Sequence, residues 1–228
     1  MRFYPIIWVI GPSRSCKTAM ARGLSQKGPA PTNYPVFSTG DYYRRRYGRP
    51  DTFNARFIFN ISSFTTSHLV YNKAAHQSDM IDFLHKNQSP VIIEGERNPF
   101  VFGRFYRPGK DLVFFMNRQN IEKYDTAIEP GVQNIYQNLK WGVKAGFIPL
   151  KSVISFKFGD GRVQAEHLPA PGENLIDEVF YDQPEFPRHE GDLYPWMGTL
   201  VALAQDKVLE TPQFNKLSLS NPYATPEV

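Results

Sequence analysis

The chain has 228 residues, enough for one well-buried core and a small additional element. Hydrophobic residues make up 41% and charged residues 21%, which excludes both a disordered chain and a membrane-embedded one. The formal net charge of +4 is by itself weak evidence for a polyanionic partner.

The N-terminal region and the cysteine content predict a cytoplasmic protein. The apolar run at residues 6–10 is too short to span a bilayer, and no signal-peptide cleavage site follows it. Cys16 is the single cysteine, so an internal disulfide and a cysteine-rich metal site are excluded. The histidines show no metal-ligand spacing.

Short apolar runs alternate with helical patterns in the first two thirds of the chain. Residues 6–10 end at Gly11 and are typical of a strand buried on both faces of a parallel sheet. A helix is predicted from Lys17 to about Gln26, and a short strand at residues 36–38. Two helices are predicted between residues 54 and 86.

The same alternation continues with two more buried strands and a helix. Residues 91–93 and 112–116 are all apolar, and a helix is predicted from Val132 to about Gly146. Short apolar strands alternating with helices predict an α/β fold with a doubly wound parallel sheet.

The pattern changes after residue 150. Alternating residues around Gly159-Asp160-Gly161 predict a β-hairpin, and a final helix is expected at residues 196–209. The proline-rich segment 169–195 predicts an irregular surface loop. We therefore divide the chain into a core at residues 1–158 and a C-terminal extension at residues 159–228, packed on the core.

A phosphate-binding loop follows the first strand. The pattern is glycine, four residues, glycine, lysine, then serine or threonine, and Gly11 to Thr18 match it except for Cys16 at the second glycine. Backbone N–H groups of such a loop bind phosphate oxygens, Lys17 reaches the β and γ phosphates, and the Thr18 hydroxyl coordinates Mg²⁺. The predicted cofactors are ATP and Mg²⁺, with Gly11, Ser13, Arg14, Ser15, Cys16, Lys17 and Thr18 as the nucleotide-binding loop.

Two kinase families share these motifs. The loop resembles that of nucleotide kinases with a Gly-Pro-Ser opening, and Ser38-Thr39-Gly40-Asp41-Tyr42-Tyr43-Arg44 is similar to an acceptor-binding segment of adenylate-kinase-like enzymes. The same residues resemble the Asp-x-Tyr-Arg segment of polynucleotide kinases. The resemblance to adenylate-kinase-like enzymes implies that Arg44 holds the phosphate of the acceptor, and it places Thr39, Gly40, Tyr42 and Tyr43 at the acceptor.

The role of Asp41 depends on the acceptor. The resemblance to polynucleotide kinases implies that Asp41 is the general base that takes the proton of a hydroxyl. If the acceptor is a phosphate, no base is needed, and Asp41 would instead cap the following helix.

Three further residues complete the candidate site. Glu94 stands at the carboxyl end of the predicted strand at 91–93, where an acidic residue can hold Mg²⁺ or its water. The kinase resemblance implies acceptor binding by Arg97. Arg118 follows the fourth strand and is a candidate for nucleotide binding.

Three functions remain open from the sequence. The basic, tyrosine-rich stretch 41–49 favours a kinase that acts on a hydroxyl of a nucleic acid, and the chain loosely resembles phage kinases of 5-hydroxymethyluracil in DNA. The Ser-Thr-Gly-Asp-x-x-Arg match favours a mononucleotide kinase instead. A non-catalytic nucleotide-binding switch is the third alternative.

Overall fold

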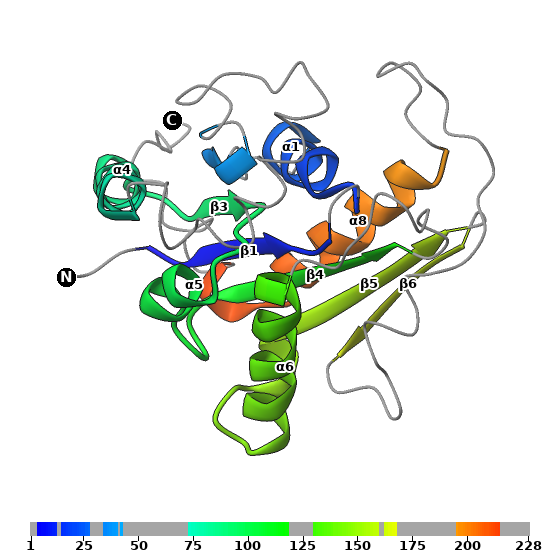
Figure 1. Ribbon diagram of the computed structural model, residues 1–228. Helices are drawn as coiled ribbons and strands as arrows, with labels where there is room; N and C mark the ends of the chain where they lie inside the picture. The colour runs from blue at the N-terminus through cyan, green and yellow to red at the C-terminus, as the bar shows by residue number, and fades with distance from the viewer. Residues whose placement is uncertain are drawn as a thin grey trace, which may run out of the picture.

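The computed structural model describes residues 4–12, 15–27, 34–40, 42, 73–118, 130–159, 162–167 and 195–214. Within these ranges the chain is an α/β fold in which helices cover both faces of one six-stranded sheet (Figure 1). The predicted fold class is therefore confirmed.

The sheet has the strand order β2-β3-β1-β4-β5-β6. Every neighbouring pair from β2 to β5 is parallel, and β6 alone runs antiparallel, as the partner of β5. This last pair is the hairpin predicted around residue 160. The strands are β1 (Ile6–Ile10), β2 (Val36–Ser38), β3 (Val91–Glu94), β4 (Leu112–Arg118), β5 (Val153–Gly159) and β6 (Arg162–His167).

The central strand β1 is buried along its whole length. Because successive side chains of a strand point to opposite faces, Ile6, Trp8 and Ile10 enter one core and Ile7 and Val9 enter the other. Both faces of the sheet are thus covered, which explains why the parallel strands read as unbroken apolar runs.

Of the helices in the described ranges, three cover one face and two cover the other. Side chains of α4 (Lys73–Lys86), α5 (Pro99–Phe105) and α6 (Pro130–Lys144) join the core that contains Trp8. Side chains of α1 (Lys17–Lys27) and α8 (Pro195–Leu209) join the core that contains Val9.

Helix α5 was absent from the elements predicted by the sequence. The helix begins with an N-cap: the Asn98 side chain accepts hydrogen bonds from the backbone N–H groups of Phe100 and Val101, at 3.0 and 3.4 Å. Pro99 is its first residue, a position that favours proline. Seven residues are too few to show a helical period, so only the cap could have predicted it.

Several predictions lie outside the described residues: the helix between residues 54 and 72, the loop around 169–194 and the C-terminal tail. The division at residues 158 and 159 also stays a prediction, although β5 and β6 extend the same sheet. Among the helices that the structure describes, none has the length and apolar character needed to cross a bilayer.

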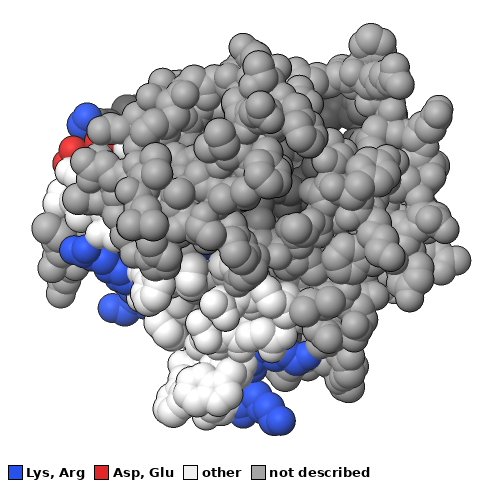
Figure 2. Space-filling model, viewed as in Figure 1, with Lys and Arg blue, Asp and Glu red and all other residues white. Residues whose placement is uncertain are grey.

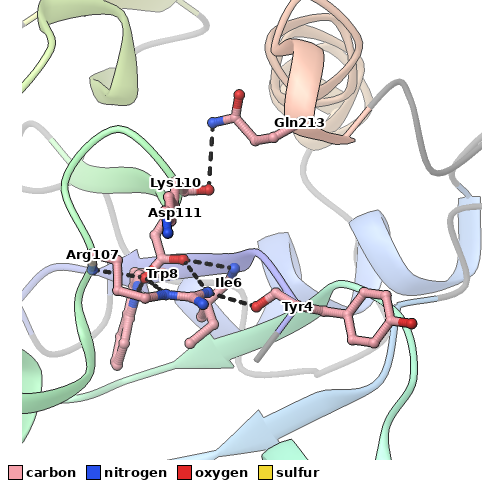
Figure 3. A network of polar contacts seen from close by, with 7 residues as sticks. All are labelled: Tyr4, Ile6, Trp8, Arg107, Lys110, Asp111 and Gln213. Carbon is pink, nitrogen blue, oxygen red and sulfur yellow. Dashed lines mark hydrogen bonds and ion pairs between the residues drawn. The ribbon is translucent and has the colours of Figure 1, made fainter. Parts of the chain in front are cut away.

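The edge at which the strands begin is held by Asp111, which is fully buried (Figure 3). Its carboxylate accepts hydrogen bonds from Ile6 N at 3.1 Å and from Trp8 Nε1 at 3.4 Å. It also pairs with the Arg107 guanidinium at 2.7 Å, and Arg107 donates in turn to the Tyr4 carbonyl at 2.6 Å. Burial raises the pKa of Asp111, and the hydrogen bonds from Arg107 partly offset that rise. The network joins the start of β1 to the start of β4.

Candidate active site

The predicted phosphate loop lies between the end of β1 and the start of α1. Gly11, its first residue, passes so close to β4 that a Cβ there would lie 2.4 Å from the Met116 carbonyl oxygen and 2.7 Å from Ser15 Oγ. No side chain fits in that space. Glycine is therefore required at this position, as the phosphate-loop pattern predicts.

Cys16 stands where the pattern has a second glycine, and its backbone keeps the glycine conformation. Its φ of 55° lies in the left-handed region, and it is the single non-glycine residue with positive φ among the residues that the structure describes. That conformation costs a side-chain-bearing residue about 1–3 kcal/mol. The half-buried thiol packs against the core below α1. Cys16 therefore keeps a backbone conformation that favours glycine, with local strain.

Lys17 is 7% exposed and lies within the loop. Its ammonium donates to the Pro12 carbonyl and lies 3.4 Å from Ser15 Oγ, which itself donates to Pro12 at 2.8 Å. Helix α1 begins at this lysine and has no acidic residue in its first turn. A buried ammonium and a helix N-terminus thus combine their positive potentials at one point, as an anion site requires.

Thr18 and Glu94 meet across the carboxyl ends of the strands. The Thr18 hydroxyl donates to Glu94 Oε1 at 3.2 Å, and the Ser38 hydroxyl donates to the same oxygen. Three elements thereby converge, because Thr18 belongs to α1, Ser38 ends β2 and Glu94 ends β3. Glu94 is 3% exposed, so the position predicted from sequence is confirmed as a buried strand end rather than a surface loop.

This hydroxyl and carboxylate fit a magnesium ion. Mg²⁺ prefers oxygen ligands and usually keeps several waters beside one or two protein ligands. Thr18 and Glu94 supply two such oxygens 3.2 Å apart, next to the lysine that would face a phosphate. These are the residues that the sequence predicted as metal ligands.

The acceptor side begins where β2 ends. Gly40 approaches the loop after β3 closely, since a Cβ on Gly95 would lie 3.9 Å from Gly40 N. Thr39 is 2% exposed, and its hydroxyl has no hydrogen-bond partner among the described residues. Tyr42 stacks on Phe37, with ring centroids 5.9 Å apart. Thr39, Gly40 and Tyr42 thus follow the end of β2, which pairs with β3 at Glu94, and their role in acceptor binding stays a prediction.

The sequence reasoning missed Glu96 and His76. Glu96 accepts hydrogen bonds from the backbone N–H groups of Arg97 and Asn98 at 3.0 and 2.8 Å, and both Glu96 and His76 are 2% exposed. Glu96 Oε2 lies 3.8 Å from His76 Nε2, and the His76 ring is 5.0 Å from that of Tyr42. Burial raises the pKa of Glu96 to about 7 against the opposing hydrogen bonds. The sequence feature that could have revealed Glu96 is its place two residues after Glu94, at the end of the strand.

The structure describes the remaining predicted residues only in part. Arg97 lies next to Glu96, where its charge opposes the rise in the Glu96 pKa. Arg118 ends β4, and its side chain is not among those described. The others lie outside the described residues, so their predicted roles stay predictions: Ser13, Arg14, Asp41, Tyr43 and Arg44.

Comparisons with known proteins give structural neighbours only. No protein-family model and no curated protein matches the chain. A gluconokinase from Sinorhizobium meliloti 1021 is 14% identical over 78% of this chain and 89% of its own, with a TM-score of 0.31. A thymidylate kinase from Candida albicans is 14% identical over 68% and 84%, with a TM-score of 0.36. A sugar kinase from Janibacter sp. HTCC2649 is 13% identical over 68% and 85%, with a TM-score of 0.30. At such TM-scores these likenesses carry no weight on activity.

Proposed function

We propose that the chain is a P-loop kinase that uses ATP and Mg²⁺ to phosphorylate a hydroxyl of a nucleic-acid acceptor. The observation that carries this proposal is the convergence of Lys17, Thr18 and Glu94 at the carboxyl ends of β1 and β3. The Lys17 ammonium can bind phosphates, and the Thr18 and Glu94 oxygens beside it can bind a metal ion. In the loop before them, Gly11 and Cys16 both have backbone positions that favour glycine.

Each residue has a defined task in that reaction. Lys17 and the N–H groups at the start of α1 hold the β and γ phosphates and neutralise the charge that develops during transfer. Thr18 and Glu94 would hold the Mg²⁺, which would offset the negative charge of the phosphates. Ser38 fixes the orientation of Glu94 through its hydrogen bond.

The acceptor side favours a hydroxyl over a phosphate. Glu94 and Glu96 are both buried there, and a phosphate acceptor would bring a further anion beside the Glu94 carboxylate. The unpartnered Thr39 hydroxyl offers a neutral acceptor a hydrogen bond. In the transfer the acceptor oxygen bonds to the γ phosphorus, the bond to the ADP oxygen breaks, and Asp41 takes the hydroxyl proton.

The nucleic-acid part of the proposal is supported by the basic, tyrosine-rich stretch that follows Gly40. Arg44, Arg45, Arg46 and Arg49 supply phosphate contacts, and the tyrosines among them supply stacking surfaces. 5-Hydroxymethyluracil in DNA is one hydroxyl acceptor of this class.

Transfer of label from γ-labelled ATP tests the proposal. Acceptors are mononucleotides, DNA with free 5′ ends and DNA that carries 5-hydroxymethylpyrimidines, with Lys17→Ala as the blank and the exposed Lys86→Ala as its matched control. We expect label in DNA with wild type and Lys86→Ala and none with Lys17→Ala. Label in mononucleotides alone would replace the proposal by a mononucleotide kinase. ATP binding without any transfer would favour a nucleotide-binding switch.

A further inference from the structure

The end of α6 presents two exposed aromatic rings. Trp141 in the last turns of the helix is 64% exposed, and Phe147 just beyond its end is 67% exposed. Their ring centroids lie 5.5 Å apart at an interplanar angle of 42°. Leu150, which follows closely, is 49% exposed. Apolar side chains grouped on a surface in this way mark sites of interaction.

The turn after α6 fixes the position of these rings. Gly146 has a φ of 78°, its N–H donates to the Val143 carbonyl at 3.1 Å, and the Phe147 N–H donates to the Gly142 carbonyl at 2.9 Å. This is a Schellman motif, in which a contact such as that between Phe147 and Trp141 is common. The motif explains why the rings touch, but not why about two thirds of each is exposed. Because the backbone already holds the rings, little ordering is needed on binding.

The segment that carries the rings has charged residues of one sign. Residues 131–158 include four lysines and no aspartate or glutamate. Lys157 pairs with Glu166 at 3.4 Å, whereas Lys144 and Lys151 are exposed. Lys144 follows Trp141 by three residues, which places both on one side of the helix. Figure 2 shows white and blue atoms on the described surface over α6 and no red ones there.

We propose that this surface binds single-stranded nucleic acid. Bases stack on the Trp141 and Phe147 rings, and backbone phosphates pair with Lys144 and Lys151, which is how proteins hold single strands without reading their sequence. We call the surface the α6 tip; it comprises Trp141, Lys144, Phe147, Leu150 and Lys151.

Two other occupants fit the α6 tip less well. A second copy of the chain, joined by a two-fold axis through this surface, would bring the lysines of both copies together. A membrane-binding helix lies in the interface with its whole apolar face exposed to lipid, but that face of α6 is already buried in the core through Val132, Ile135 and Leu139.

The α6 tip also lies at a distance that suits a polymer. The start of α6 packs against the loop after β3, because a Cβ on Gly131 would lie 2.1 Å from the Arg97 carbonyl. A helix of 15 residues is about 22 Å long, so the tip is roughly that far from the loop that carries Glu96. A strand bound at the tip can reach the proposed acceptor site, and a mononucleotide cannot span both.

Binding of a fluorescein-labelled single-stranded DNA of about 16 nucleotides tests the inference without ATP, so its outcome does not depend on phosphoryl transfer. Two double variants are compared with the wild type. One combines Trp141→Ala and Phe147→Ala, and the other combines Lys144→Gln and Lys151→Gln. The matched control combines Phe100→Ala and Lys86→Gln, which are equally exposed residues elsewhere. Thermal melts show that each variant folds.

We expect each α6-tip pair to weaken binding by about tenfold or more and the control pair to leave it unchanged. The lysine pair should also lower the slope of log K against log salt by about 2. The tryptophan emission should change when DNA binds, and this change should be missing in Trp141→Phe. Equal affinity in all variants would overturn the inference. So would binding to phosphatidylserine vesicles, or self-association through Trp141, in the absence of DNA binding.

Discussion

The two edges of the sheet treat their buried polar groups in opposite ways. Where the strands begin, the Asp111 carboxylate accepts hydrogen bonds from β1 and is paired with Arg107. Where the strands end, Thr39 and Glu96 each keep a buried oxygen without a hydrogen-bond partner among the described residues. Buried polar groups are normally satisfied within the fold, so the Asp111 network serves stability, whereas the oxygens of Thr39 and Glu96 are available to a ligand.

Backbone geometry divides the two edges in the same way. Cys16 adopts a left-handed φ beside Lys17, on the side where the strands end. Strained residues persist only where the surrounding structure holds them, and they gather at functional sites. If this contrast is correct, substitutions at the carboxyl edge should change activity more than stability, and those at the other edge should do the reverse.

The largest expected effect is that of Lys17→Ala at the carboxyl edge. If Lys17 binds the phosphates as proposed, loss of its ammonium should lower kcat by about 10³-fold, which corresponds to about 4 kcal/mol in the barrier. The melting temperature should fall little, because the substitution also removes a buried charge. Steady-state transfer of label and a thermal melt on the same preparation measure both. If Lys17→Ala lowers the melting temperature strongly but leaves the activity per folded molecule unchanged, the proposed difference between the two edges is wrong.

At the opposite edge Asp111→Ala should destabilise the fold by about 3–4 kcal/mol. The substitution leaves Arg107 without its buried partner and leaves the N–H groups of Ile6 and Trp8 unsatisfied. Urea unfolding measures the loss, and kcat at low temperature should stay near that of the wild type.

The control for Asp111→Ala is an ion pair of similar length at the surface. Lys207 and Glu210 lie 2.8 Å apart, but 61% of the Glu210 side chain is exposed. Glu210→Ala should therefore cost no more than about 1 kcal/mol. Equal losses in the two variants would show that burial does not set the strength of the Asp111 network.

The Glu96 carboxyl should make stability depend on pH. Burial raises its pKa from 4.5 to about 7, so between these pH values the folded state holds one more proton than the unfolded state. The free energy of unfolding should therefore fall as the pH rises from 4.5 to 7, by about 3 kcal/mol, and then level off. Urea unfolding of the wild type and Glu96→Gln, without nucleotide or metal, measures this difference. The same slope in both proteins would assign the pH dependence to another group.

The smallest expected effect concerns Cys16. Cys16→Gly should be more stable than Cys16→Ala by about 1 kcal/mol, because glycine adopts a φ of 55° without strain. Inside an ordinary helix the order would be reversed, since alanine is favoured there by a similar amount. Thermal melts of the two variants decide between these orders, and the reversed order would show that the loop is relaxed.

The sheet was predictable because its strands are buried on both faces. Five residues such as Ile6–Ile10, all apolar and followed by glycine, leave few alternatives. The phosphate loop was predictable for a similar reason, since its glycine and lysine stand at fixed positions along the chain. Pairing across the sheet was harder to predict. Glu94 could be named from its strand end, but its shared contact with Thr18 and Ser38 depends on the order of strands.

Other site residues gave no periodic or motif signal. His76 lies 20 residues before Glu96, and nothing in the spacing predicts that α4 brings the two side chains to 3.8 Å. Their meeting follows from the packing of α4 against the core that contains Trp8. Sequence patterns thus predicted the proposed phosphate side of the site more completely than the proposed acceptor side.

The place of β1 at the centre of the sheet also affects how the chain can fold during its synthesis. β1 leaves the ribosome first, but its neighbours are β3 and β4, which end at Glu94 and Arg118. At about 5–20 residues per second the delay before β4 is made is on the order of 5–20 s. Until β3 and then β4 are made, at least one edge of this apolar strand lacks its partner and is open to wrong ones. We therefore expect stalled chains shorter than β4 to need chaperones, and longer ones to close the sheet rapidly.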